Sequence, residues 1–264
     1  MTHAVSYPDR TDSPLLHVED RAGVAVLRID NGKVNALDLE LLVRIAGAMD
    51  EVADATAVVL TGTGSSFSAG VDLRRIVAGD AEHTDTFLTA LSRALVAVFR
   101  HPRPVVAAVN GHAIAGGCVL AAAADVRLMS GGSLGLTELR VGVPFPTAAI
   151  EIVRYAVGSA APSLAMFAEL HDPQRAHQMG LVHGVCAPEV LVDEAIVWAR
   201  RLAAVTPETF ALTKRQLHAP AEARIAERTE RDDADVRRLW KSADGRAAIS
   251  AFLDGLARTD DRRS

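Results

Sequence analysis

One stretch of this sequence, residues 104–135, constrains the fold more than any other. It opens with an apolar, β-branched run, PVVAAV, that predicts a buried strand. The dipeptide NG at 110–111 interrupts this run, and AGG at 115–117 leads directly into an apolar helix with the sequence CVLAAAAD. A second short strand, VRLMS, follows Asp125 and closes the unit. A strand, a glycine-containing loop and a buried helix in this order indicate an α/β fold.

The glycine pair at 116–117 stands at the mouth of the apolar helix, where it allows a ligand to approach the backbone closely. Free N–H groups and the positive end of a helix dipole at such a place stabilise an oxygen that carries negative charge. The alternative interpretation is a tight strand-to-helix turn that only needs small residues. The pair therefore indicates either an anion-stabilising site or a compact turn.

Strand–loop–helix units recur along the first part of the chain at a spacing of roughly 45 residues, a period typical of repeat architectures. Their strands are expected at Val24–Ile29, Ala57–Thr61 and in the apolar run after residue 103. Amphipathic helices are expected at 38–52 and 83–100, where apolar residues fall at helical spacing. This arrangement resembles a superhelical array of strand–strand–helix turns more than a doubly wound sheet.

The composition changes along the chain in a way that suggests three parts. Residues 1–14 are polar and contain prolines, so we expect a loosely ordered tail. Residues 15–187 are the expected core, and residues 188–264 are expected to be a helical region that makes contacts between subunits. After Gly158 the helices are expected at about 162–170, 173–179, 188–204, 207–218, 221–243 and 245–257.

Composition and charge favour a soluble globular protein. Hydrophobic residues make up 49% and charged residues 23%, and the formal net charge of -5 gives no reason to expect binding to nucleic acid. No run approaches the roughly 18 apolar residues of a membrane span, and no secretion signal is recognisable. Cys118 and Cys186 cannot form a disulfide framework and lack the spacing of metal ligands. We therefore expect a cytoplasmic protein that holds no metal and binds neither nucleic acid nor a membrane.

Five stretches, in this order and spacing, resemble the crotonase superfamily, the enoyl-CoA hydratases and isomerases. The resemblance implies the fold of that family, an α/β, crotonase-like spiral of strand–strand–helix turns with a helical C-terminal extension. It also implies an acyl-CoA substrate, of which coenzyme A is a part, no further cofactor, and assembly as a homotrimer or dimer of trimers. The stretches are KVNAL at 33–37, FSAGVDL at 67–73, AVNGHAIAGGCVLAAAADVRL at 108–128, GLTELRVGVPFP at 135–146 and AHQMGLV at 176–182.

The resemblance assigns an oxyanion hole to the backbone N–H groups of Val71 and Gly116. Family members stabilise the enolate that forms at the thioester carbonyl, and two fixed donors in a dry pocket meet that charge without solvent reorganisation. Arg74 is either a phosphate contact or a solvated helix charge, and Phe252 lies where family members reach the coenzyme A of a neighbouring subunit. The acyl-CoA-binding surface that the motif match implies comprises Asn35, Ala36, Leu37, Ala69, Gly70, Asp72 and Leu73.

The acid/base positions of the family distinguish its activities. Family hydratases use two glutamates to hold and activate water; in this chain the first position is Val119 and the second is Glu138. Valine cannot bind or deprotonate water, whereas one carboxylate can still move a proton between two carbons of an acyl chain. Burial in an apolar setting would raise the pKa of Glu138 and make it a better proton shuttle near neutral pH. The pattern therefore resembles the Δ3,Δ2-enoyl-CoA isomerases more than the hydratases.

Two other functions remain open from the residues alone. One is an enoyl-CoA hydratase, a lyase, with an altered site; the other is a silent acyl-CoA-binding protein in which Glu138 is only a surface or capping carboxylate. Family members that use a distal aspartate have Pro146 at that position in this chain, which argues against a dienoyl isomerase. The segment Pro144-Phe145-Pro146 replaces a glycine-containing segment of many hydratases and is expected to narrow the pocket.

Overall fold

The computed structural model describes residues 15–260, so the expected tail at 1–14 lies outside the described residues. Its centre is a six-stranded sheet with the order β1-β2-β3-β5-β7-β9. The first pair of strands is antiparallel, and every later pair in this sheet is parallel. The strands are β1 (Leu16–Arg21), β2 (Val24–Ile29), β3 (Ala57–Gly62), β5 (Val105–Val109), β7 (Val126–Met129) and β9 (Gly184–Val185).

A second, smaller sheet of three parallel strands lies beside the first. It has the order β4-β6-β8, with β4 (Ser66–Ser68), β6 (His112–Ile114) and β8 (Leu134–Gly135). Each short strand directly follows a long one, so the three turns that begin with β3, β5 and β7 each add one strand to each sheet and then a helix. The α/β spiral of strand–strand–helix turns expected from the sequence is therefore confirmed.

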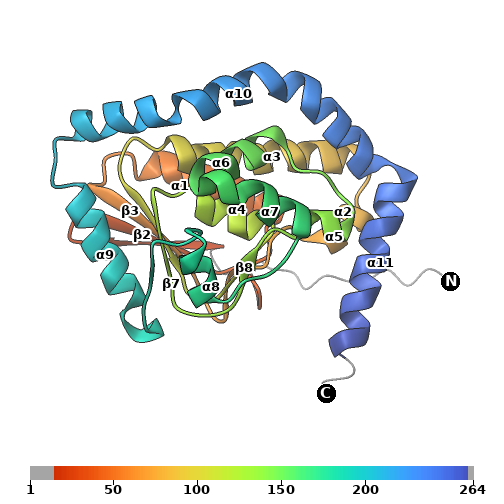
Figure 1. Ribbon diagram of the computed structural model, residues 1–264, viewed down its shortest axis with the longest axis horizontal. Coiled ribbons are helices and arrows are strands. Elements are labelled where there is room, and N and C mark those ends of the chain that lie inside the picture. Colours follow the sequence, from red (N-terminus) through yellow and green to blue (C-terminus); the bar gives the residue numbers. More distant parts are fainter. Residues whose placement is uncertain (1–14, 261–264) are drawn as a thin grey trace.

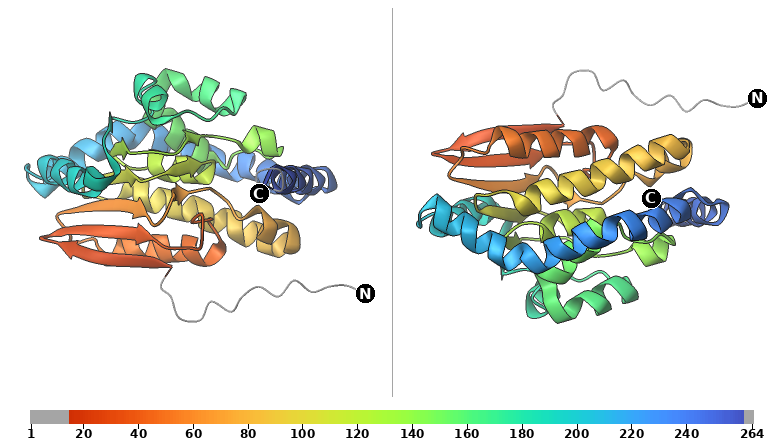
Figure 2. Two further views of the ribbon diagram at one scale, coloured as in Figure 1. Left: turned by 90° about the horizontal axis from the view of Figure 1, so that it is seen from below. Right: turned by 90° about the horizontal axis from the view of Figure 1, so that it is seen from above.

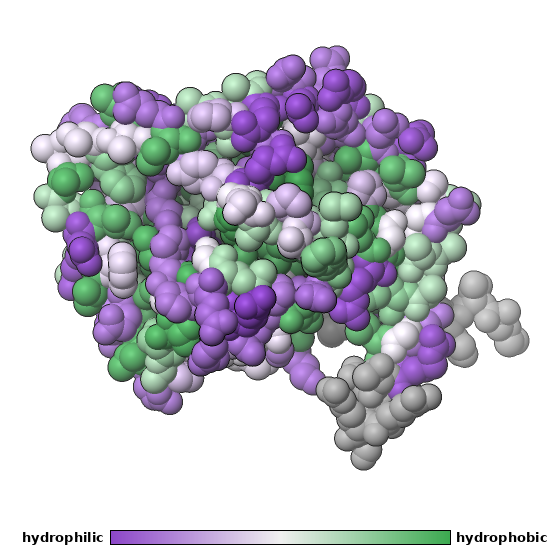
Figure 3. All heavy atoms as spheres, viewed as in Figure 1, coloured by the Kyte–Doolittle hydropathy of each residue, from purple (hydrophilic) through white to green (hydrophobic). Residues whose placement is uncertain are grey.

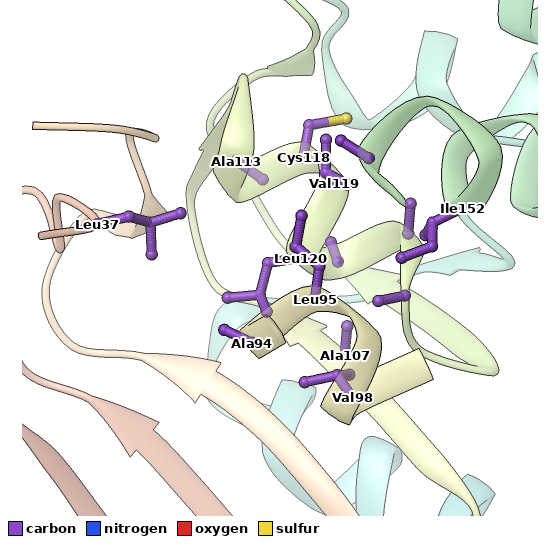
Figure 4. Packing of buried hydrophobic residues seen from close by; sticks show 14 of the residues in the cluster. Leu37, Ala94, Leu95, Val98, Ala107, Ala113, Cys118, Val119, Leu120 and Ile152 are labelled. Carbon is purple, nitrogen blue, oxygen red and sulfur yellow. The ribbon is translucent and has the colours of Figure 1, made fainter. Parts of the chain in front are cut away.

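The two faces of the large sheet are covered by different helices (Figures 1 and 2). Side chains alternate along each strand, so one set packs on α9 (Leu191–Leu202) and the other on the central helices. Helix α4 (Gly116–Ala122), at the centre, is buried at every position, which explains its apolar sequence. Figure 4 shows Leu120 of α4 with Leu95 and Val98 of the neighbouring helix. The remaining central helices are α1 (Leu39–Glu51), α3 (Ala81–Arg100) and α6 (Thr147–Val157).

Short helices complete the region around the pocket. They are α2 (Leu73–Ala78), α5 (Glu138–Val141), α7 (Ala161–Phe167) and α8 (Pro173–Gln178), with single 3-10 turns at Gly158–Ala160 and Pro188–Val190. None of the helices within residues 15–260 has the length and apolar character needed to cross a membrane.

Two long helices, α10 (Pro207–Lys241) and α11 (Ala243–Asp260), end the chain (Figure 1). Figure 3 shows hydrophilic residues along much of the outer edge that α10 forms. The prediction of separate helices at 207–218 and 221–243 is wrong, because one helix runs through Pro220. Proline removes one helical hydrogen bond, but His218 before it and Ala221 after it are both buried, and this packing on α3 and α6 keeps the helix continuous.

Candidate active site

The first of the two loops that carry the predicted oxyanion donors follows β4 and is held by the loop after β2. The N–H of Leu37 donates to the carbonyl of Gly70 at 2.8 Å, and the N–H of Asp72 donates to the carbonyl of Leu37 at 3.0 Å. These two bonds hold the backbone on both sides of Val71. The N–H of Val71 itself has no hydrogen-bond partner among the described residues.

The second loop, between β6 and α4, packs directly on the first. Gly70 has φ +88°, and a Cβ there would lie 2.6 Å from the carbonyl oxygen of Ile114, so only glycine allows this approach. A Cβ on Gly117 would lie 2.1 Å from the carbonyl oxygen of Ser68, which excludes any side chain at that position as well. The glycines of both loops therefore permit a close contact between two turns of the spiral.

The two N–H groups assigned to the oxyanion hole lie near one another as a result. A Cβ built on Gly116 would be 3.9 Å from the nitrogen of Val71, so the backbones of these residues are neighbours. The N–H of Gly116, like that of Val71, finds no acceptor in the part of the chain that the structure describes. Buried backbone donors are nearly always paired, so two unpaired donors side by side indicate a place for an external oxygen atom.

A cavity of about 270 Å³ lies in front of these donors. It is an apolar space bordered by the loops described above, by α3, α5 and α6, and by the two C-terminal helices. Five of the predicted site residues line it: Ala69, Val71, Leu73, Gly116 and Glu138. The other lining residues are Leu91, Leu95, Ile114, Ala115, Val119, Thr137, Arg140, Val141, Val143, Pro146, Ala149, Leu170, Trp240, Phe252 and Leu256.

Glu138 is the acidic residue of this cavity. It is the first residue of α5, the residue is 9% exposed, and its Oε2 atom has no hydrogen-bond partner among residues 15–260. Burial raises the pKa of Glu138 to about 7, while the backbone amides of Thr137 and Glu138 oppose this with a smaller effect. A carboxyl group with this pKa can accept a proton and release it again near neutral pH. The structure therefore buries Glu138 at the cavity and leaves one of its oxygens free.

Two neighbours of Glu138 are chemically inert. Val119 is 1% exposed and lines the same cavity, so an apolar side chain stands where the family hydratases have their first glutamate. Cys118 is buried, and burial, together with the charge of Glu138, raises the pKa of its thiol far above the ordinary value. Within the described lining residues, Glu138 is the single group suited to move a proton at neutral pH.

The other predicted contacts build the loops and do not line the cavity. Asn35 is fully buried, has φ +51°, and donates from Nδ2 to the carbonyls of Thr63 (3.1 Å) and Ser66 (2.8 Å). Asp72 caps α2 by accepting a hydrogen bond from the N–H of Arg75. Their side chains are thus occupied within the protein. Of the predicted acyl-CoA-binding residues, those outside the cavity lining are Asn35, Ala36, Leu37, Gly70 and Asp72.

The C-terminal helices contribute cavity residues that the sequence did not indicate. Trp240 of α10 and Phe252 and Leu256 of α11 line the cavity of their own chain, and the contact of Phe252 with the coenzyme A of a neighbouring subunit stays a prediction. Arg246 ties α11 to the end of α2, because its guanidinium donates to the carbonyls of Ile76, Val77 and Gly79. Apolar residues at helical spacing predict a buried face, but they do not show which cavity that face will border.

Comparisons with known proteins agree with the observed fold. Residues 19–258 match the family described as "Enoyl-CoA hydratase/isomerase". A "Putative enoyl-CoA hydratase" of Thermus thermophilus is 34% identical over 210 residues, covering 77% of this chain and 83% of the relative. "Enoyl-CoA delta isomerase 1, mitochondrial" of Homo sapiens is 27% identical over 231 residues, covering 84% and 76%. The crystal structure of human mitochondrial delta3-delta2-enoyl-CoA isomerase superposes with a TM-score of 0.88 at 24% identity, covering 93% of this chain and 99% of that one.

Proposed function

We propose that this chain, which belongs to the enoyl-CoA hydratase/isomerase family, moves the double bond of an enoyl-CoA from position 3 to position 2. The observation that carries this proposal is a cavity with one buried carboxylate, Glu138, whose Oε2 atom has no partner among the described residues, and with Val119 in place of a second carboxylate. A 1,3-proton shift needs one base that returns the proton it takes, whereas hydration also needs a group that holds water.

The proposed reaction uses two sets of groups. The thioester oxygen of the substrate accepts hydrogen bonds from the N–H groups of Val71 and Gly116. The carboxylate of Glu138 removes a proton from C2, and the electron pair of that C–H bond delocalises into a dienolate whose negative charge rests on the thioester oxygen. The same proton then returns to C4, which leaves the double bond between C2 and C3. Fixed donors stabilise this intermediate because they need no reorganisation when the charge develops.

The apolar lining supports the same chemistry. Desolvation holds the pKa of Glu138 near 7, so its basic and acidic forms are both accessible at neutral pH. Water that entered the cavity would find Val119 in the lining as well as the carboxylate, and valine offers no hydrogen bond to orient the water. A site that orients no water favours return of the proton to carbon over addition of hydroxide.

The test is an assay of 3-hexenoyl-CoA with the wild-type protein beside Glu138→Gln. We expect the wild type to form the 2-enoyl product and the variant to lose about 1000-fold in rate, within the usual range for an acid/base group. Binding of saturated hexanoyl-CoA should be similar in both, which shows that the variant is folded. Wild-type protein that binds acyl-CoA but does not exchange the C2 or C4 protons would instead be a binding protein.

A second candidate function is hydration of 2-enoyl-CoA. It is favoured by the description of the Thermus thermophilus relative as a putative hydratase. Crotonyl-CoA distinguishes the two functions, because its double bond is already at position 2. Robust formation of 3-hydroxybutyryl-CoA, with slow conversion of 3-hexenoyl-CoA, would replace the isomerase with a hydratase that activates water without a second glutamate.

A further inference from the structure

We propose that Asp233, a residue of α10 outside the cavity lining, is a positioning residue that holds the inner wall of the pocket and thereby limits the length of the acyl chain. This inference rests on the proposed binding of acyl-CoA, but it does not depend on which reaction follows. It starts from the Pro144-Phe145-Pro146 segment, which lies between Glu138 and helix α6.

Helix α6 lacks a capping side chain of its own. Its N-cap position is Pro146, which makes no side-chain hydrogen bond to the helix. Asp233 supplies the cap from a distant part of the chain, because its Oδ1 atom accepts the N–H of Thr147 at 2.8 Å and the Oγ1 hydroxyl of Thr147 at 2.6 Å. Asp233 is 8% exposed and Thr147 is 4% exposed, so water competes little for these bonds.

A second bond from α10 reaches the same segment. The indole Nε1 of Trp240, two helical turns beyond Asp233, donates to the carbonyl of Pro144 at 3.0 Å. Trp240 is 2% exposed and lines the cavity itself. Helix α10 thus holds the segment at residue 144 and at residue 147, on both sides of the cavity-lining Pro146.

The position of this segment in the cavity follows from burial. Arg140, Leu170 and Leu256 line the cavity and are exposed, so they mark its mouth. Val143 and Pro146 line it and are buried, as are Ala149 and Trp240, so this group belongs to the buried part of the lining, away from the mouth. A thioester held at the two N–H donors directs the tail of its acyl chain away from the mouth. The wall that Asp233 holds is therefore the one against which a long chain would end.

This arrangement defines a class of substrate, an acyl-CoA with an apolar tail of limited length. Each methylene group that enters an apolar pocket improves affinity by roughly fourfold, which corresponds to ~0.8 kcal/mol. The gain should continue until the chain reaches the wall at Val143 and Pro146 and should stop there, because the close-packed side chains leave no further space. The chain length at which the gain stops measures the position of the wall.

The experiment measures the affinity of saturated acyl-CoAs from four to fourteen carbons for three proteins by calorimetry. The wild type should show rising affinity and then a plateau. Asp233→Ala removes the oxygen that accepts both hydrogen bonds of Thr147, so the plateau should shift by at least two carbons while butanoyl-CoA still binds as in the wild type. The matched control is Asp235→Ala, the same change on the same helix at an exposed residue that pairs with Arg238, and its profile should equal that of the wild type.

Two results would overturn the proposal. One is a profile of Asp233→Ala identical to the wild type, and the other is a uniform loss of affinity at every chain length, which a merely structural residue would give. Asp233→Asn, whose amide oxygen can still accept both hydrogen bonds, provides a second variant and should keep the plateau close to that of the wild type. In the isomerase assay the change should appear in KM for long substrates and not in kcat for 3-hexenoyl-CoA. Failure of the wild type to bind any acyl-CoA would contradict the proposed function itself, whereas binding without turnover would leave this test intact.

Discussion

Two buried carboxylates on consecutive helices, Glu138 of α5 and Glu151 of α6, are treated by the fold in opposite ways. Glu151 is 1% exposed and accepts hydrogen bonds at 2.5 Å from Arg154 and at 2.5 Å from Arg224. Glu138 is 9% exposed and, in the part of the chain that the structure describes, it has no basic partner and keeps one oxygen without any hydrogen bond. The charge of Glu151 is balanced by two guanidinium groups, whereas the charge of Glu138 is removed only when the carboxylate binds a proton.

This difference distinguishes a carboxylate that stabilises the fold from one that we propose takes part in the reaction. Removing an ionised carboxylate from water is costly, and a pair of arginines offsets the cost at Glu151. The same chain provides no such partner at Glu138, where desolvation instead raises the pKa to about 7. A buried charge without a partner is unfavourable for stability, and it is found here at the cavity in front of the two unpaired N–H groups of Val71 and Gly116.

The largest expected effect is on activity, where the two glutamates should differ most. Glu138→Gln should lower kcat/KM for 3-hexenoyl-CoA by about 1000-fold, because the amide cannot take up the proton. Glu151→Gln is the matched control, and its folded fraction should retain activity within about threefold, the small change expected of a residue outside the reacting groups. Steady-state kinetics on protein checked by circular dichroism measures both values. Similar losses of kcat/KM in the two variants would mean that the two carboxylates do not differ in function.

The second effect concerns the stability that Glu151 provides. Glu151→Gln should lower the free energy of unfolding by roughly 3 kcal/mol, because both arginines lose their ionic partner. The loss should lie at the low end for a buried pair, since the side chains of Arg154 and Arg224 are 49% and 33% exposed and can be partly hydrated. Urea unfolding at pH 7 measures this change. Unchanged stability would mean that the pair gives no net stabilisation.

The same substitution at Glu138, Glu138→Gln, should raise the free energy of unfolding at high pH instead of lowering it. The folded-state pKa of about 7 exceeds the ordinary value of 4.5, so the folded protein binds more protons than the unfolded chain between these pH values. Stability therefore falls as the pH rises through this range, and Glu138→Gln, which resembles the protonated form, should be more stable than the wild type by up to ~3 kcal/mol at pH 8. At pH 4 the two proteins should differ little. Parallel urea titrations at both pH values test this, and destabilisation at pH 8 would contradict it.

The sequence was sufficient to predict the parts of the site that are built locally. The loop with Gly70 and the loop with Gly116 each lie between a short strand and a helix, and each depends on glycine for a close backbone approach. Such requirements are confined to a few consecutive residues, so short motifs reveal them. The spiral of strand–strand–helix turns was predictable for the same reason, since each turn repeats a local pattern.

The parts that the sequence did not reveal depend on contacts between distant residues. Arg224 lies 73 positions from Glu151, and Asp233 lies 86 positions from Thr147, so no spacing rule connects them. The continuity of α10 through Pro220 also depends on tertiary packing, which outweighed a strong local signal for a helix end. Long-range ion pairs, caps and cavity walls require the folded arrangement of helices before they can be recognised.

The smallest effect is the pH dependence that should distinguish the two carboxylates in the wild-type enzyme. Because the base must be ionised in the free enzyme, kcat/KM should rise about tenfold per pH unit below pH 7 and level off above it. Glu151→Gln should show the same profile, since Glu151 is held by two arginines and does not contact the reacting atoms. Initial rates from pH 5 to 9, with enzyme stability checked at each pH, give the two curves. A midpoint near 4.5 in the wild type would mean that Glu138 titrates as a hydrated carboxylate and that its burial does not tune the reaction. A midpoint that differs between the wild type and Glu151→Gln would mean that the two sites are coupled through α6.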